Sequence, residues 1–503
     1  MMRTAELRFA RPEKISRLVL TAMLAAAALT LAPAGCAVNP ATGRTALTGF
    51  TTAADEARIG REQHPQILQA FGGAYEGSGL DAYVNRIGQA LARQTERTDV
   101  TYTFTILNSP IVNAIATPGG YVYITRGLLA LADNEGEVAS VLGHELGHIT
   151  ALHHAQQQSR QTLASLGIAA LAIATGAPAA LIQGTQLAAL AYLRSFSREQ
   201  EYEADQLGAR YMARAGYDPR AAVAFLRKLQ AYTTLQETIL GQPGRAERFG
   251  FLATHPTTAD RIESAIAAAR VTVVANPTVG RDSYLEAIDG MLYGEPASQG
   301  YIRGRTFSHP LLRISFEVPP EYQLFNTQNA VFAPGPGEAL IVFDAAPQPE
   351  RLRQMTMAQY VGGAGRTTLN GVTAMRVNGL EAATGWVNVQ TNRGPMELRL
   401  AAIRTEPARV YRFRFLTPLT LLAQLGPGNM RTIQSFRTLS PAEAAALKPL
   451  RVRVVMVNKG DTVAAMAKRM AFETYRAERF RVLNGLAPGA ELTPGQRVKI
   501  ITE

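Results

Sequence analysis

The histidine pair His144 and His148 encloses Glu145 in the pattern H-E-x-x-H, within a stretch of helical periodicity. In a helix, residues four apart lie on one face about one turn apart, so both imidazoles can bind the same Zn²⁺. Glu145 lies beside them, where a carboxylate can take a proton from an attacking water molecule. The chain contains only 7 histidines, so a chance match has a probability on the order of one per cent. The pattern therefore predicts zinc-dependent hydrolysis.

A second acidic segment offers the further ligand that a zinc hydrolase requires. Hydrolytic zinc sites combine three protein ligands with an open position for water. Glu201 and Asp205 lie four residues apart within another helical pattern. In this E-x-x-x-D arrangement we expect Glu201 to bind zinc and Asp205, one turn on, to orient the ring of a zinc histidine. An acidic helix face is ordinarily solvated, but the apolar neighbours and the H-E-x-x-H motif favour a metal site here.

The pattern of apolar residues predicts the elements that must position these groups. Helices are expected over residues 135–154, 198–215, 219–233 and 259–270. Strands are expected over residues 100–107, 111–116 and 121–125. The turn Pro118-Gly119-Gly120 predicts that the last two strands pair antiparallel. Residues 160–194 have no charge between their ends, and we interpret them as buried or lid helices rather than a membrane hairpin, because their apolar runs are short and interrupted.

The amino-terminal residues 1–35 have the layout of a secretory signal: a basic segment, an apolar stretch and a small-residue cleavage region. Ala34-Gly35-Cys36 resembles a lipobox, which would make Cys36 the lipidated first residue of the mature protein. Cleavage after Ala34 by ordinary signal peptidase and an uncleaved anchor are the alternatives. Cys36 is the only cysteine, so no internal disulfide can form. We expect a periplasmic protein, anchored to the outer membrane because Ala37 replaces the aspartate that retains lipoproteins at the inner membrane.

Length and composition indicate a large folded protein with several domains. A chain of 503 residues corresponds to about three domains. Its 47% hydrophobic and 18% charged residues exclude a disordered or fibrous protein. The net charge of +11 favours anionic partners, such as membrane surfaces or cell-wall polymers. With an export signal present, we expect no nucleic-acid partner.

The carboxyl-terminal half differs from the first half in its sequence pattern. Residues 273–304 are expected to be a linker, and residues 305–440 an α+β domain that resembles the PsbP/Mog-type domains. Its expected strands cover residues 312–318, 339–343, 386–391, 396–403 and 410–416, with one helix over 350–361. Nothing in this domain indicates chemistry. A small third unit is expected over residues 450–501.

Several motifs show which known family the first half of the chain resembles, and they occur in the same order as in that family. They are Asn39-Pro40-Ala41-Thr42-Gly43, Asn113-Ala114 with Pro118-Gly119-Gly120, the H-E-x-x-H segment 141–148, the segment 201–205, and His255-Pro256 with Arg261. This part of the chain, roughly residues 39–270, is similar to the HtpX/CAAX-prenyl-protease-like zinc metallopeptidases, in their soluble bacterial envelope branch. The resemblance implies a mainly helical gluzincin-type domain over residues 36–272, with a small antiparallel sheet.

The resemblance also implies roles for particular residues. Glu145 would be the general base, and His144, His148 and Glu201 would hold one Zn²⁺ per chain. The segment Asn113, Ala114, Ile115 and Ala116 would be an edge strand that pairs with an extended substrate. His255 and Arg261 would stabilise the tetrahedral oxyanion, although His255 could instead occupy the open zinc position and block water.

The remaining histidines are expected to serve the fold. His153 and His154 follow the motif and are interpreted as helix-surface residues rather than ligands. His64 and His309 have no partner at ligand spacing, and we expect structural roles for both.

The carboxyl-terminal unit carries a second resemblance. Its segments 457–462, 483–486 and 492–498 are similar to a LysM module, whose fold is β-α-α-β and whose usual ligand is the glycan of peptidoglycan. The middle, residues 469–481, is longer and richer in arginine than the LysM pattern. A LysM-like fold used only for packing or docking is therefore the alternative.

Together these features predict a multidomain α+β protein that acts as a zinc endopeptidase on envelope proteins, and the family resemblance implies that its substrates are misfolded or misassembled ones. A zinc peptidoglycan peptidase or amidase directed by the LysM-like module is one alternative. A chaperone or adaptor with a structural metal site is the other, and Glu145 argues against it, because a structural site needs no base.

Overall fold

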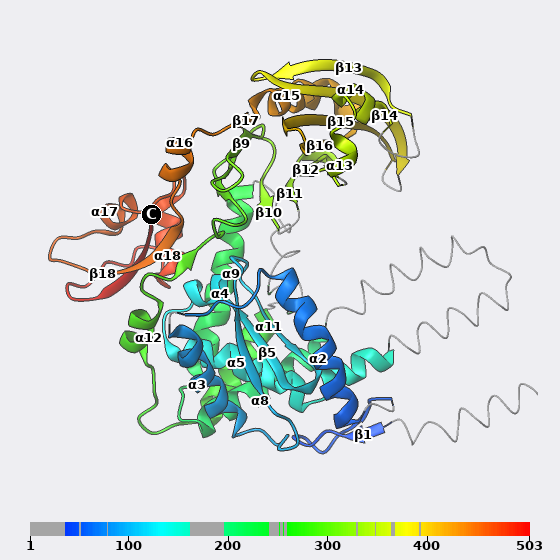
Figure 1. Ribbon diagram of the computed structural model, residues 1–503. Helices are drawn as coiled ribbons and strands as arrows, with labels where there is room; N and C mark the ends of the chain where they lie inside the picture. Colours follow the sequence, from blue (N-terminus) through cyan, green and yellow to red (C-terminus); the bar gives the residue numbers. More distant parts are fainter. Residues whose placement is uncertain are drawn as a thin grey trace, which may run out of the picture.

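The computed structural model describes residues 36–49, 52–77, 79–160, 196–240, 251, 255, 259–327, 330–347, 349–363, 368–391 and 394–503. A mainly helical body carries the H-E-x-x-H motif, a sheet domain lies at the top of Figure 1, and a small carboxyl-terminal unit packs beside the body. This is the multidomain α+β architecture that we expected. The expected signal segment and almost all of residues 160–194 lie outside the described residues.

Helix α5 (Glu135–Thr150) forms the centre of the helical body, and every one of its residues is buried. It begins at Asn134, whose side chain accepts a hydrogen bond from the backbone N–H of Glu137, as capping residues do. Around it lie α2 (Ala53–Ala70), α3 (Leu80–Ala92), α4 (Arg126–Leu131), α8 (Arg198–Arg214), α9 (Arg220–Leu240), α11 (Ala259–Val271) and α12 (Arg281–Ile288).

Close contact between α5 and α8 depends on small residues. A Cβ atom added at Gly147 would lie 2.8 Å from the carbonyl oxygen of Ala204, and one added at Gly208 would lie 2.9 Å from the backbone nitrogen of His144. Backbones can approach this closely only where no side chain separates them. The glycine inside the H-E-x-x-H motif therefore brings the acidic residues of α8 within reach of the two histidines.

A three-stranded sheet lies against α5. Its order is β3 (Thr103–Leu107), β5 (Tyr121–Thr125) and β4 (Ala114–Thr117). Strand β4 pairs antiparallel with β5 across the turn at residues 118–120, which confirms the expected pairing. Strand β3 runs parallel to β5, so the sheet is mixed and not antiparallel throughout, as the family resemblance had implied. Among the described strands, β4 has a neighbour on one side only.

The α+β domain contains a seven-stranded antiparallel sheet. Its order is β10 (Phe325–Asn326), β11 (Val331–Pro334), β12 (Leu340–Ala345), β16 (Arg409–Pro418), β15 (Gly394–Glu406), β14 (Leu380–Thr391) and β13 (Asn370–Val377). Helices α13 (Pro349–Leu352), α14 (Met357–Gly362) and α15 (Leu422–Ser435) accompany it. A four-stranded sheet adjoins it, with the order β17 (Arg437–Thr438), β9 (Ile314–Glu317), β8 (Thr306–His309) and β7 (Tyr301–Arg303). His309 is buried there, and its ring lies 3.2 Å from the carbonyl of Ser298.

The carboxyl-terminal unit follows the short helix α16 (Pro441–Ala446). It has the element order β18 (Leu450–Met456), α17 (Val463–Lys468), α18 (Arg476–Leu483) and β19 (Arg497–Thr502). Strands β18 and β19 pair antiparallel, and β6 (Leu292–Tyr293) adds a third strand from the preceding segment. Residues of this unit and of the helical body belong to one hydrophobic core. The unit is therefore packed onto the body.

The segment 273–304, expected to be a linker, takes part in the same core. It contains α12, whose Tyr284, Leu285 and Ile288 are fully buried, and it supplies β6. The apolar residues of this helix are too few to show a clear period among the surrounding Pro, Gly and Asn, so the sequence alone indicated a spacer.

A buried lysine joins the carboxyl-terminal unit to the base of α5. The ammonium of Lys499, in β19, donates to the carbonyl oxygens of Ala130 and Leu131 at 2.9 and 3.1 Å and pairs with Asp133 at 3.0 Å. Burial lowers the pKa of Lys499 to about 8, despite the carboxylate beside it. A buried ammonium needs this full set of partners, so the contact fixes the unit in one orientation.

No helix among the described residues is long and apolar enough to cross a membrane.

Candidate metal centre

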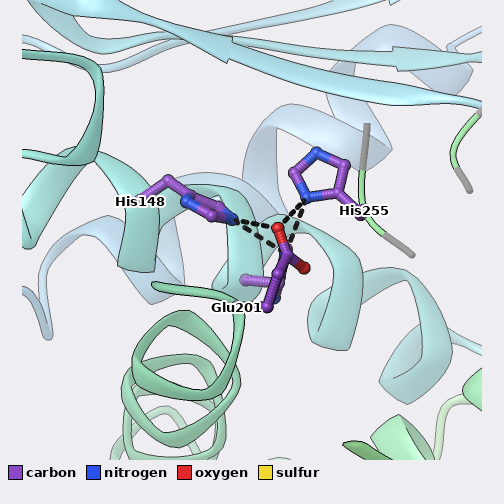
Figure 2. A group of neighbouring side chains, drawn as sticks. His148, Glu201 and His255 are labelled. Atoms are coloured by element: carbon purple, nitrogen blue, oxygen red, sulfur yellow. Dashed lines mark hydrogen bonds and ion pairs between the residues drawn. The ribbon is translucent and has the colours of Figure 1, made fainter. Parts of the chain in front are cut away.

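Four buried side chains meet at one point between α5, α8 and the segment that precedes α11. They are His144, His148, Glu201 and His255, and one ligand atom from each lies within 4.8 Å of all the others. Figure 2 labels three of them, His148, Glu201 and His255. The Nε2 atoms of His144 and His148 are 3.0 Å apart. The Nδ1 atom of His255 lies 3.2 Å from Nε2 of His144 and 2.9 Å from Oε1 of Glu201. Sequence spacing predicted the first three members of this group, and the tertiary structure adds His255.

The donor set fits a zinc ion. Both Nδ1 atoms of the motif histidines are engaged elsewhere, which leaves the two Nε2 lone pairs directed at each other. Opposed lone pairs without a proton between them are unfavourable unless a cation lies there. Four ligands at the Zn–N and Zn–O distances of a tetrahedral site would be about 3.3 Å apart. Five of the six separations in the group, measured to one or the other oxygen of Glu201, are 2.9–3.5 Å and therefore close to this value.

His144 is oriented directly by a carboxylate. Its Nδ1 lies 2.8 Å from Oδ1 of Asp205, and Arg261 donates two hydrogen bonds of 2.8 Å to the same carboxylate. Burial alone would raise the pKa of Asp205, but Arg261 and His144 outweigh it and lower the pKa to about 2. Asp205 is therefore an anion that accepts from Nδ1–H, which leaves Nε2 of His144 free for a metal.

His148 is oriented through a second imidazole. Its Nδ1 lies 2.9 Å from Nδ1 of His153, whose Nε2 lies 3.1 Å from Oε2 of Glu203. A carboxylate can only accept, so His153 carries its proton on Nε2 and its Nδ1 accepts from His148. Burial and the neighbouring imidazoles hold the pKa of His148 well below its usual value. The neutral ring thus presents Nε2 to the metal position.

This arrangement corrects the expectation for His153. It is fully buried, rather than a helix-surface residue. The expected helix over 135–154 ends at Thr150, and Leu152 adopts a left-handed φ of 60°, which redirects the chain. In an uninterrupted helix, a residue five positions after His148 would point away from it. His154 is half-buried, and Phe196 stacks on His148 with ring centroids 3.9 Å apart.

Glu145 lies beside the group and is 1% exposed. Its Oε1 has no hydrogen-bond partner among the described residues and lies 3.6 Å from Nε2 of His255. A buried carboxylate oxygen without a hydrogen-bond partner raises the free energy of the folded state unless another group occupies the space next to it. The carboxylate of Glu145 therefore lies next to the ligand group, with one oxygen free to meet a bound molecule.

His255 and Arg261, for which the family resemblance implied roles in catalysis, are both buried next to the ligand group, and they contact different atoms. The ring of His255 stacks on Phe251 and belongs to the ligand group. Burial would lower the pKa of His255, but Glu201 and Glu145 outweigh burial and raise it. Arg261 pairs with Oε2 of Glu201 at 2.7 Å and with Asp205, so its guanidinium contacts two acidic residues of α8. Pro256 lies outside the described residues.

The expected edge strand borders the site. Strand β4 includes Ala114, Ile115 and Ala116, lies next to α5 and is terminal in its sheet. Asn113 precedes it and accepts from the backbone N–H of Ala114 through its side chain. The backbone N–H of Phe251 donates to Val112 at 2.8 Å, which connects this strand to the segment of His255.

Fold and site define the class of this domain. Residues 79–269 match the model of Peptidase family M48. The chain thus contains an M48 metallopeptidase domain, the family uses zinc, and the buried group of three histidines and a glutamate could hold that ion.

Curated relatives of this domain carry two names. The chain is 32% identical over 216 residues to the beta-barrel assembly-enhancing protease of Yersinia pestis, which covers 41% of this chain and 42% of that protein. It is 33% identical over 158 residues to the protein of that name from Escherichia coli K12, covering 30% and 32%. It is 28% identical over 215 residues to the mitochondrial metalloendopeptidase OMA1 of Schizosaccharomyces pombe, covering 41% and 59%. The chain thus spans less than half the length of the two bacterial relatives.

Among solved structures, the chain resembles LpqN of Mycobacterium tuberculosis, a protein involved in cell envelope biogenesis. The TM-score is 0.21 at 12% identity, over 25% of this chain and 83% of that one.

Proposed function

We propose that the protein is a zinc-dependent endopeptidase of the bacterial cell envelope. His144, His148 and Glu201 hold the metal, and Glu145 accepts the proton of the attacking water. The observation that carries the proposal is the convergence of these ligand atoms beside a buried carboxylate oxygen that has no hydrogen-bond partner among the described residues. Zinc bound there supplies Lewis acidity, which polarises the scissile carbonyl and makes water more acidic.

His255 occupies the position that hydrolysis requires to be open. A tetrahedral site with three protein ligands leaves one place for water, and here Nδ1 of His255 lies at ligand distance from its neighbours. This favours the blocking role for His255 over donation to the oxyanion. Arg261 keeps Glu201 and Asp205 in place through charge-assisted hydrogen bonds. Cleavage then requires His255 to move away.

Extended segments of envelope proteins, misfolded or misassembled ones above all, are the proposed substrates. Strand β4 has a side without a neighbouring strand among those described, and an extended peptide can pair there by main-chain hydrogen bonds. The names of the bacterial relatives, which are proteases associated with β-barrel assembly, support protein rather than glycan as the substrate.

The proposed location is the periplasm, at the outer membrane, through a lipid on Cys36. The export signal and the lipobox-like sequence support it. Replacement Cys36→Ser should release the protein from membranes into the soluble envelope fraction. Membrane association that is unchanged by the replacement would reject the lipid anchor.

Peptidoglycan remains the second candidate ligand, because the carboxyl-terminal unit has the β-α-α-β order of a LysM module. Its close packing on the helical body favours a docking role instead. Sedimentation of the protein with purified peptidoglycan sacculi tests glycan binding, and release of sacculus peptides tests the amidase alternative.

The central experiment compares the wild type with Glu145→Gln. The variant should keep one zinc per chain and lose cleavage of an unfolded protein by about 10²–10⁴, because the ligands remain while proton transfer fails. Zinc analysis and digestion of a reduced, alkylated protein measure the two quantities. Undiminished cleavage would reject the mechanism, and a wild type that binds zinc but cleaves nothing would favour the chaperone or adaptor alternative.

A further inference from the structure

The amino-terminal segment reaches the metal centre through a chain of hydrogen bonds. Strands β1 (Cys36–Val38) and β2 (Thr45–Leu47) form a short antiparallel hairpin. Its turn is closed by backbone bonds between Asn39 and Arg44 and between Gly43 and Asn39, both 2.8 Å. Gly43 adopts a φ of 72°, which favours glycine at this position. The motif Asn39–Gly43 therefore specifies a turn.

That turn is attached to α8 at two places. Asn39 is 2% exposed, and its side-chain oxygen accepts from the backbone N–H groups of Ala41 and Thr42. Its amide group is thereby aimed at Glu203, to which it donates at 2.9 Å. The hydroxyl of Thr42 donates to the same carboxylate oxygen at 3.1 Å. Arg210, farther along α8, approaches the carbonyl of Ala41 at 3.4 Å.

We propose that this hairpin positions a metal ligand: Asn39 and Thr42 hold Glu203, Glu203 holds His153, and His153 orients the ring of His148. Asn39, Thr42, Glu203 and His153 are positioning residues, because none of them contacts the metal position. The inference rests on the proposed function, since it takes His148 as a zinc ligand.

At each step the donor and the acceptor can be told apart, so the direction of the chain is determined. The two oxygens of Glu203 are divided between the hairpin, on Oε1, and His153, on Oε2. Amide and hydroxyl donors on Oε1 hold the carboxylate plane and keep Oε2 directed at His153. Loss of these donors would let Glu203 turn toward solvent, and His153 would lose the acceptor that sets its tautomer.

The consequence is that the zinc site includes residues next to the proposed lipid attachment point. Cys36 lies three positions before Asn39 and is paired with Leu47 in the hairpin. A hairpin that is pulled away from α8 would leave His148 without its outer support. The zinc affinity of the domain therefore depends on a folded amino terminus.

The test uses the full mature chain and measures zinc affinity by competition with a chelator. In Asn39→Asp the two acceptor bonds of the turn remain, but a carboxylate replaces the amide donor opposite Glu203. Glu203→Gln removes the charge at the next step. We expect each variant to bind zinc about tenfold more weakly, within the range known for outer-sphere partners of metal ligands. Thr45→Val is the matched control, because Thr45 is exposed in the same hairpin and is not a member of the hydrogen-bonded chain from Asn39 and Thr42 through Glu203 to His153.

Two further readouts separate positioning from general stability. Cobalt bound in place of zinc should show an altered visible absorption spectrum in both variants, while thermal unfolding of the metal-free proteins stays close to wild type. The double variant Asn39→Asp/Glu203→Gln should bind zinc no more weakly than Glu203→Gln alone, because two carboxylates no longer oppose each other. Wild-type zinc affinity and cobalt spectra in Asn39→Asp and Glu203→Gln would overturn the inference. Retention of zinc by His148→Ala would instead reject the ligand set of the proposed function.

Discussion

The two histidines of the H-E-x-x-H motif are held in place in different ways. His144 is bound directly by Asp205, and Asp205 by Arg261, so its support consists of two adjacent helices, α8 and α11. His148 is bound by His153, then Glu203, then the amino-terminal hairpin. Both routes deliver the same result, an imidazole with Nε2 toward the metal position. The first route is short and carries a buried ion pair, whereas the second is long and ends at the surface.

The comparison shows that the residues that orient metal ligands can be buried beside the site or partly exposed and held by another segment. Asp205 is buried with Arg261 and stays charged at all ordinary pH values, because its pKa is lowered to about 2. Glu203 is partly exposed and depends on Asn39 and Thr42 for its orientation. We therefore expect the residues that support His144 to contribute more to zinc affinity than those that support His148. Changes in the amino-terminal hairpin should affect the site through His148.

The largest expected effect comes from removing either ligand. His144→Ala and His148→Ala should each weaken zinc binding at least about a thousandfold, because a site with two remaining protein ligands of the proposed three holds zinc poorly. Zinc content after dialysis measures this. A large difference in zinc content between the two variants would show that His144 and His148 do not bind the same ion.

The next effect compares the two carboxylates. Asp205→Asn should weaken zinc binding by about 100-fold and Glu203→Gln by about tenfold, the two ends of the range for outer-sphere partners. Asp205→Asn also leaves Arg261 buried with one carboxylate fewer, which adds to the cost. Chelator competition on both variants checks the order, and equal losses would contradict the ranking of the two sides.

A smaller effect is expected for His255, which contacts both sides of the group. His255→Ala should retain zinc and raise the cleavage rate of an unfolded protein a few-fold, because it opens the fourth position. Steady-state cleavage rates provide the measurement, with Arg261→Ala expected to lower turnover. A slower His255→Ala enzyme would assign His255 to oxyanion stabilisation instead.

A separate comparison concerns the stability of the fold, which depends on the distance between α5 and α8. Gly147→Ala places a Cβ 2.8 Å from the carbonyl of Ala204 and should destabilise the fold by about 1–3 kcal/mol. Gly143→Ala meets the carbonyl of Gly208 at 3.2 Å and should cost less. Thermal unfolding of the two variants measures the difference, and the reverse order would show that the helix contact is tighter on the His144 side.

Much of the site could be predicted from local spacing. Residues four apart on a helix share a face, and this is sufficient to pair His144 with His148 and Glu201 with Asp205. The helices over residues 198–215 and 259–270 were placed within about one residue of their observed bounds, because their apolar positions repeat with the helical period. The helix over 219–233 was too short, since α9 continues to Leu240 with fewer apolar residues.

Other features have no local signal. The role of His153 depends on a left-handed residue, Leu152, that is not a glycine or asparagine, so no turn was predicted before it. The contact of Asn39 with Glu203 joins residues 164 positions apart. Helix α15 was missed because Gly426, Pro427 and Gly428 interrupt its pattern.

The sequence by itself determined which atoms could bind a metal, because ligand type and helical spacing are local properties. It also determined that a carboxylate, that of Glu145, stands next to them. Only the tertiary structure decided that His255 joins the ligand group, that His153 faces inward, and that Lys499 fastens the last strand to the base of α5. These contacts join segments that are distant in sequence or separated by a turn, and their energy comes from burial of polar groups that must find partners once the helices pack.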